Sequence, residues 1–131
     1  IMLGRVEWKG DSRVDCFNEA GDCIEIDWDN GPTPVQAVLQ MIGACSLADI
    51  QIGLKDRKID KIWIELDGER ATTSPKVFTK VSMTYYVEGE APKKLVRRLV
   101  EKSHETYCTV SNMFKSTVEF TSNVVVNGEL C

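Results

Sequence analysis

The sequence lacks several features that would assign it to a well-known functional class. Its 16 basic side chains are outnumbered by 20 acidic ones, whereas nucleic-acid-binding domains normally carry a basic balance or stripe. It has no phosphate-binding loop, no CxxC pair and no nucleophile-elbow motif. A single histidine also leaves few familiar ligands for zinc. We therefore expect no nucleic-acid partner, no metal and no cofactor.

Secretion and membrane insertion are not indicated either. The first residues are too charged, and their apolar run is too short, for a secretory signal. The longest apolar stretch, residues 31–54, lacks 18 clean apolar residues because polar residues interrupt it. We expect a cytoplasmic protein without membrane association, in which cysteines are thiols first and any disulfide is transient or catalytic.

The chain length and the spacing of its apolar residues indicate one α+β domain over residues 1–131. Alternation and helical periodicity predict the order β-β-β-α-β-β-α-β, with antiparallel sheets around a central buried helix. The predicted elements are an N-terminal β-meander at about 3–28, a central helix at about 33–54, a β-hairpin at about 61–88, a second helix at about 92–107 with a short helical segment to about 115, and a last strand at about 118–126.

The central helix is apolar on every side, so we expect the rest of the chain to cover it on every side. Thr33 and Pro34 are typical of an N-cap followed by the first helical residue. Gly43 and Ala44 are small, so another backbone or a ligand can approach closely. They immediately precede Cys45, which makes this thiol the first candidate for chemistry.

The cysteines have no metal-site spacing, and their number is odd. Cys16 and Cys23 flank a predicted hairpin turn, where a disulfide is one reading. We expect residue 16 to lie opposite residue 25, however, and this register favours unpaired thiols. The five cysteines are Cys16, Cys23, Cys45, Cys108 and Cys131.

Cys45 and Cys108 remain as candidate reactive thiols. Each, taken alone, is more often an inert buried cysteine than a nucleophile. Reactivity requires a nearby cation, a helix N-terminus or hydrogen bonds to the sulfur. Thr109 could cap a new helix and so bring the Cys108 sulfur near free backbone N–H groups. His104 has charged neighbours on its helix, and we expect it to be exposed.

Three segments together resemble a known family. GPTPVQAVLQMIGACSLAD at 31–49, PKVFTKVSMTYYVEG at 75–89 and SHETYCTVSNM at 103–113 occur in this order. The combination resembles the OsmC/Ohr family of organic hydroperoxide reductases, and more closely its YhfA-like branch. The resemblance covers most of residues 24–125.

The resemblance implies an OsmC-like α+β fold, an intertwined homodimer and an active site at the subunit interface. It implies that Cys45 attacks an organic hydroperoxide and that Cys108 resolves the sulfenic acid as an intrasubunit disulfide. A small-molecule or protein thiol would then restore the pair. The implied function is a cysteine-based peroxidase of the oxidative stress response.

The sequence departs from this pattern in the groups that activate the thiol. The family's glutamate lies ten residues before its cysteine, and nine in the YhfA-like branch, where this chain has Val35 and Gln36. No arginine or lysine lies between Val14 and Cys45. Asp49 shares the helix face of Cys45, where its charge would disfavour a thiolate. Gln36 and Asp49 are the candidate supporting residues, and we expect weak or narrow activity.

Two other functions fit the same residues. The first is a non-catalytic protein of this fold that binds a small apolar or electrophilic ligand at the dimer interface. The second is a structural oligomerisation domain in which both thiols are inert. For Asp49, a functional role and a hydrogen bond to the partner subunit are both left open.

Overall fold

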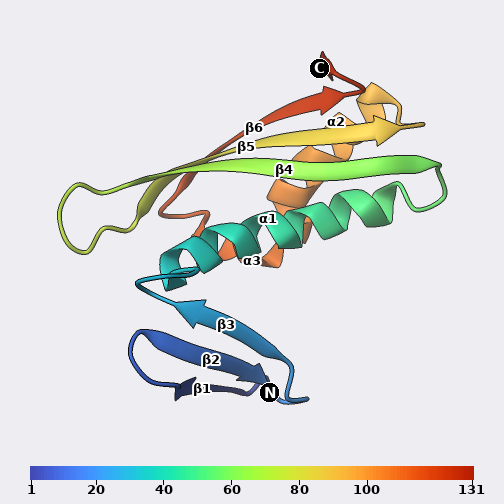
Figure 1. Cartoon of the computed structure of the whole chain (residues 1–131). Helices are drawn as coiled ribbons and strands as arrows, with labels where there is room; N and C mark the ends of the chain where they lie inside the picture. The colour runs from blue at the N-terminus through green and yellow to red at the C-terminus, as the bar shows by residue number, and fades with distance from the viewer. The chain divides into compact units, whose positions relative to one another are not determined.

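The computed structural model describes residues 1–131 and divides into two compact units, Ile1–Leu39 and Gln40–Cys131. It contains two β-sheets and three α-helices, which confirms the predicted α+β class (Figure 1). The elements follow in the order β1 Gly4–Trp8, β2 Arg13–Asn18, β3 Cys23–Asp27, α1 Pro34–Gly53, β4 Ile59–Arg70, β5 Phe78–Gly89, α2 Lys93–Lys102, η1 Ser103–Tyr107, α3 Thr109–Phe114, β6 Glu119–Val126 and β7 Glu129–Leu130.

The first unit contains the predicted three-stranded meander, in the order β1-β2-β3. Its register differs by one residue from our expectation, because Cys16 lies opposite Ile24 and Cys23 lies opposite Phe17. The Asn18 N–H donates to the Asp22 carbonyl, so three residues form the loop instead of two. Since successive side chains alternate between the faces of a strand, Cys16 and Cys23 point to opposite faces. Both are free thiols, as the sequence favoured.

The start of α1 agrees with the sequence prediction. The Gln36 N–H donates to Thr33 Oγ1 at 3.1 Å, and the Thr33 N–H donates to Gln36 Oε1 at 3.0 Å. This reciprocal pair is a capping box, which satisfies backbone donors that the first helical turn leaves free.

The second unit contains a four-stranded sheet in the order β4-β5-β6-β7. Strands β4 and β5 form the predicted hairpin, but β5 and β6 pair in parallel, so the expectation of purely antiparallel sheets was wrong at this pair. The segment containing α2, η1 and α3 returns the chain to the end of the sheet at which β5 began, and a crossover of this kind produces parallel pairing. The short strand β7 after Asn127-Gly128 was not predicted from the sequence.

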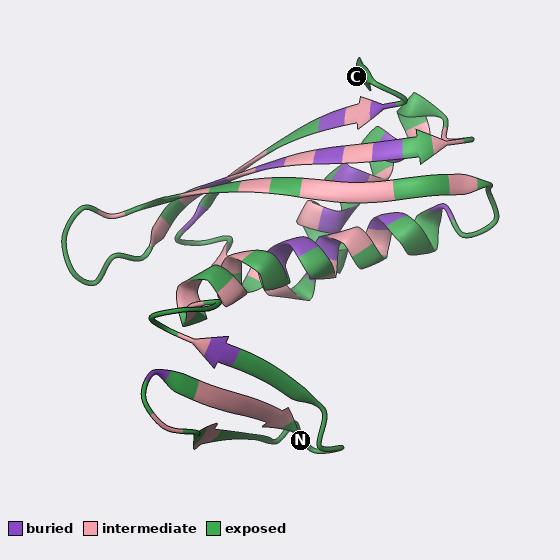
Figure 2. Cartoon of the chain, in the orientation of Figure 1, coloured by how far each residue is buried: buried purple, intermediate pink, exposed green.

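The core of the second unit lies on one face of the sheet, which the helices cover (Figures 1 and 2). Alternate residues of β5 are buried, as the strand periodicity predicts, and so is one side of α1. Met41 and Ile52 on α1 are 41% and 60% exposed, so the expectation of a helix covered on every side was wrong. The buried apolar residues here include Ile42, Ile50, Leu54, Val81, Met83, Tyr85, Val87, Val96 and Val100.

By length and composition α1 could also cross a membrane. One such helix is weak support for a membrane span, because the core helix of a soluble protein passes the same test.

Two glycines of α1 allow side chains from other elements to approach the helix. A Cβ at Gly43 would lie 2.9 Å from Leu66 Cδ1, and one at Gly53 would lie 2.4 Å from Leu99 Cδ2. Gly43, two residues before Cys45, therefore accommodates a leucine of β4. The sequence had suggested that a backbone or a ligand approaches there. Gly53 similarly accommodates a leucine of α2.

The predicted helix 92–107 is interrupted. Its α-helical part ends at Lys102, and Ser103–Tyr107 form one π-helical turn, η1. A π-turn contains an extra residue and shifts the angular phase of all that follow. As a result Tyr107, which the sequence placed on the apolar stripe, is exposed, and Cys108 is buried instead.

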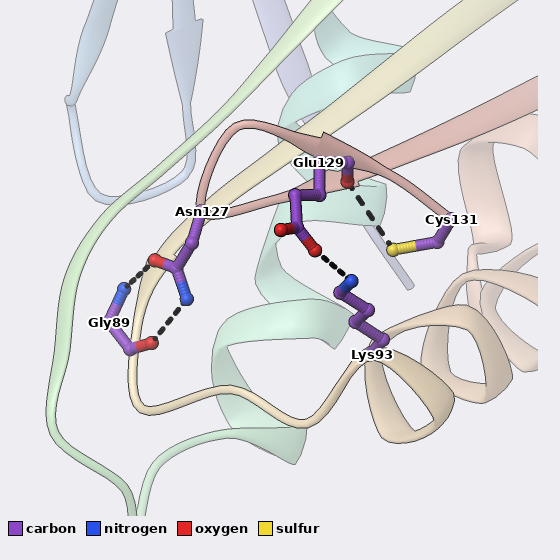
Figure 3. Close-up of polar contacts among 5 residues, drawn as sticks. All are labelled: Gly89, Lys93, Asn127, Glu129 and Cys131. Carbon is purple, nitrogen blue, oxygen red and sulfur yellow. Dashed lines mark hydrogen bonds and ion pairs between the residues drawn. The ribbon is translucent and has the colours of Figure 1, made fainter.

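The end of β5 is tied to the C-terminal hairpin (Figure 3). The Gly89 N–H donates to Asn127 Oδ1 and the Asn127 amide donates to the Gly89 carbonyl, both at 3.0 Å. Lys93 forms an ion pair with Glu129, whose carbonyl accepts a 3.6 Å hydrogen bond from the Cys131 thiol. The segment after β6 thus closes this edge of the unit.

We expect Gly89→Ala to destabilise the protein more than Gly128→Ala. Both glycines have positive φ, at 132° and 80°, and this conformation costs an L-residue about 1–2 kcal/mol. Only Gly89 is also crowded, since its Cβ would lie 2.7 Å from the Lys58 carbonyl oxygen. Overpacking of this kind adds about 1–3 kcal/mol. Urea unfolding of the two variants measures the difference, and equal losses would contradict the importance of this close approach.

Candidate active site

Two free thiols come together where α1 meets the start of α3. Cys45 lies in the middle of α1 and is half-buried, whereas Cys108 is fully buried. The Cys45 side chain is close enough to Cys108 to influence the pKa of its thiol, and the Cys108 thiol donates to the Ile42 carbonyl of α1 at 4.0 Å. The structure therefore brings together the two cysteines that the sequence singled out, and leaves only one of them accessible from outside.

The position of Cys108 is set by the π-turn before it and by α3 after it. The Cys108 N–H donates to the Ser103 carbonyl at 2.7 Å, which closes η1. Cys108 itself, and not Thr109 as expected, is the N-cap of α3, and its sulfur accepts from the Ser111 N–H at 3.4 Å. The expected proximity of this sulfur to free backbone N–H groups is present, but the cap is the thiol itself.

Burial dominates the electrostatics of Cys108. It raises the pKa of the thiol, because a thiolate is poorly solvated there, and the neighbouring Cys45 raises it further. Hydrogen bonds from the side chain and backbone of Ser111 act in the opposite direction but do not compensate. Cys108 is therefore a protonated thiol at neutral pH, and no cation is among these influences on its pKa.

The two candidate supporting residues have partners within the chain. The Gln36 side chain is engaged by Thr33 in the capping box. Asp49 Oδ2 accepts a 2.8 Å hydrogen bond from Ser103 Oγ, so the aspartate one helical turn after Cys45 is tied to the first residue of η1. No three histidine, cysteine, aspartate or glutamate side chains are grouped so as to hold a metal ion.

Sequence reasoning missed a chain of buried hydroxyls beside the thiols. Ser46 Oγ lies 2.8 Å from Ser103 Oγ and 2.5 Å from the Tyr85 hydroxyl, which lies 2.7 Å from His104 Nε2. The expected exposure of His104 was wrong, because its ring packs against Tyr85 and Phe120. One signal was available: Tyr85 falls on the apolar face of its strand, and a buried tyrosine hydroxyl normally has a hydrogen-bond partner.

A cavity of about 500 Å³ borders the histidine end of this chain. The ring nitrogen Nδ1 of His104 is buried and has no hydrogen-bond partner. Burial lowers the pKa of His104, since the charged imidazolium is disfavoured there. The cavity is lined by Glu101, His104, Glu105, Ser111, Lys115, Val118 and Phe120.

Known proteins resemble this chain over almost its whole length. The model of the OsmC-like protein family matches residues 27–123. Protein YhfA of Escherichia coli K12 is 30% identical, with 95% of this chain and 98% of the relative covered.

Solved structures share the fold. A hypothetical protein from Aquifex aeolicus has 25% identity and a TM-score of 0.89, over 97% of this chain and 96% of that one. An organic hydroperoxide resistance protein OsmC from Legionella pneumophila has 17% identity and a TM-score of 0.71, over 96% and 97% of the two chains. The family model and the match to YhfA show that the chain belongs to the OsmC-like family.

Proposed function

We propose that this protein is a cysteine-based thiol peroxidase that reduces organic hydroperoxides, with Cys45 as the attacking residue and Cys108 as the resolving residue. The observation that carries the proposal is the proximity of two free thiols, one accessible and one buried. A solved structure of the same fold is named an organic hydroperoxide resistance protein. This agrees with such a substrate.

The proposed reaction begins at Cys45. Its thiolate attacks one peroxide oxygen, the O–O bond breaks, and Cys45 becomes a sulfenic acid while the substrate leaves as an alcohol after taking a proton. The sulfur of Cys108 then bonds to the sulfur of Cys45, and the hydroxyl leaves as water with the proton of Cys108. Two thiol groups of a small-molecule or protein reductant then supply two electrons and two protons, which restore both cysteines while the reductant becomes a disulfide.

Exposure and protonation support this assignment of roles. A peroxide can reach the half-buried Cys45, whereas Cys108 is 0% exposed. Because burial raises the pKa of Cys108, this thiol stays protonated until it reacts with the sulfenic acid of Cys45. A buried, protonated thiol is a poor peroxide nucleophile. It is well placed, however, to capture a sulfenic acid before further oxidation.

We expect Cys45→Ser to abolish turnover of an organic hydroperoxide with a dithiol reductant. In Cys108→Ser exposed to peroxide before any reductant is added, the first oxidation should persist and Cys45 should accumulate as sulfenic and then sulfinic acid, because the resolving thiol is absent. Peroxide consumption and mass spectrometry of the modified peptides measure both effects. Cys131→Ser is the matched control, since its thiol donates to the Glu129 carbonyl at the C-terminal hairpin, and it should retain full turnover.

The same experiment distinguishes the rival function, a non-catalytic protein that binds a small apolar or electrophilic ligand. That function predicts no Cys45–Cys108 disulfide after exposure to peroxide. Turnover that survived Cys45→Ser would contradict the proposed role of this residue.

We further propose that the working form is a cytoplasmic homodimer. Met41 and Ile52 leave an apolar side of α1 exposed, and an exposed apolar face can mark a protein–protein interface. We expect sedimentation equilibrium to give twice the chain mass, and Ile52→Lys to shift the population toward monomer. A single monomeric species for the unsubstituted protein would contradict this assembly.

A further inference from the structure

Five side chains from α1, β5 and η1 form one continuous hydrogen-bonded series. Ser103 Oγ donates to Asp49 Oδ2 at 2.8 Å, and Ser46 Oγ lies 2.8 Å from Ser103 Oγ. The series continues from Ser46 to the Tyr85 hydroxyl at 2.5 Å, and from there to His104 Nε2 at 2.7 Å. Ser46 and Ser103 are fully buried. We call Asp49, Ser103, Ser46, Tyr85 and His104 the relay.

Counting protons fixes the direction of every hydrogen bond in the relay. Each hydroxyl has one proton to donate. Ser103 gives its proton to Asp49, so the contact with Ser46 requires Ser46 as donor. Ser46 has then used its proton, so Tyr85 must donate to Ser46 at 2.5 Å and not to Met83 Sδ at 3.9 Å. The proton at the last contact must come from His104 Nε2.

This count makes His104 the Nε2–H tautomer. A neutral imidazole with its proton on Nε2 has a lone pair on Nδ1, and Nδ1 is the buried atom without a partner. Burial lowers the pKa of His104 most, the Asp49 charge raises it, and Lys115 lowers it. The neutral form is therefore the expected state at neutral pH.

The relay ends on the segment that carries Cys108. Ser103 and His104 are the first two residues of η1, and the Ser103 carbonyl accepts from the Cys108 N–H. The Asn112 amide donates to the carbonyls of His104 at 3.2 Å and Cys108 at 2.8 Å. The side chains of η1 are therefore held by the relay, and its backbone carbonyls are held by the Cys108 N–H and the Asn112 side chain.

We propose that the relay is a positioning device that fixes the π-turn, and through it the Cys108 thiol against Cys45, with Asp49 setting the tautomer of His104. This inference depends on the proposed function in one respect, since the position of Cys108 relative to Cys45 matters only if the two thiols react with each other. Asp49, Ser46 and Cys45 lie on α1, so the anchor of the relay and its target share one rigid element. None of the five residues is proposed to touch the substrate.

The tautomer gives a direct test, because His104 is the only histidine in the chain. Two-dimensional ¹H–¹⁵N correlation of ring nitrogens should show one imidazole with protonated Nε2 and bare Nδ1 at neutral pH. Asp49→Ala removes the acceptor that directs the series, so we expect a mixture of tautomers. A predominant Nδ1–H form in the unsubstituted protein would overturn the proposal, and so would an unchanged spectrum in folded Asp49→Ala.

The second test measures positioning through the equilibrium between the dithiol and the Cys45–Cys108 disulfide in glutathione buffers. Serine replaces Cys16, Cys23 and Cys131 in the background chain. Tyr85→Phe removes two contacts of the relay, and we expect the equilibrium constant for disulfide formation to fall about tenfold, as expected for losing buried hydrogen bonds.

Tyr86→Phe is the matched control for this measurement. It removes a phenolic hydroxyl from the next residue of β5, whose 3.3 Å bond goes to Glu65 and not to the turn, and it should leave the constant unchanged. Equal constants for the two variants would overturn the positioning role. Glutathione disulfide is the oxidant here, so this measurement does not require peroxidase activity. A chain that forms no Cys45–Cys108 disulfide would contradict the proposed function. The relay would then still be tested by the tautomer of His104.

Discussion

The π-helical turn Ser103–Tyr107 is the constraint on which the candidate site depends. A continuous α-helix through this segment would keep the phase of α2 and bring residue 107 onto the buried side, as the sequence suggested. The extra residue in the turn changes the phase, so Tyr107 is exposed and Cys108 is buried. The two thiols meet because of a local irregularity, and irregularity of this kind is common at functional sites.

A buried network of hydrogen bonds holds the π-turn in one conformation. Hydroxyls of Ser46 and Ser103 in a dry environment would be costly if unpaired, but each of them has two partners. Such a network rigidifies a core when all its members are satisfied. The one exception is Nδ1 of His104, and burial lowers the pKa of this residue accordingly. The network therefore links the sheet, the thiol-bearing helix and the turn in one arrangement.

Much of the scaffold could be predicted from the sequence, because periodicity and capping are local signals. The start of α1 at Thr33-Pro34 and the alternation along β5 follow directly from residue types. The register of the first hairpin and the parallel β5–β6 pair could not be derived in this way. They depend on a loop length and on the path of a crossover, neither of which periodicity encodes.

The candidate site shows the same division. Cys45 and Cys108 were found through motifs, but the network beside them was not, since its members lie 39 and 57 residues apart in sequence. The expectation for His104 was wrong because charged neighbours on a helix say nothing about a ring that turns toward a buried tyrosine. A tyrosine on the apolar face of a strand was the one local indication that polar partners would be required.

The two thiols lie close together, but the chain supplies little to stabilise a thiolate. This combination is consistent with the weak or narrow peroxidase activity that we expect. Activation of a thiol normally needs a cation or hydrogen-bond donors. Here Gln36, at the position where the family resemblance implies a carboxylate, is engaged in the helix cap, and no cation is among the influences on the pKa of Cys108. What the chain does supply is two thiols held in one neighbourhood, and preset geometry alone can lower a barrier substantially. Proximity would accelerate disulfide formation, the second step of the proposed cycle, but it does not act on the first attack of Cys45 on the peroxide. An apolar helix side left uncovered beside that thiol is where a second subunit would bring a cation or hydrogen-bond donor.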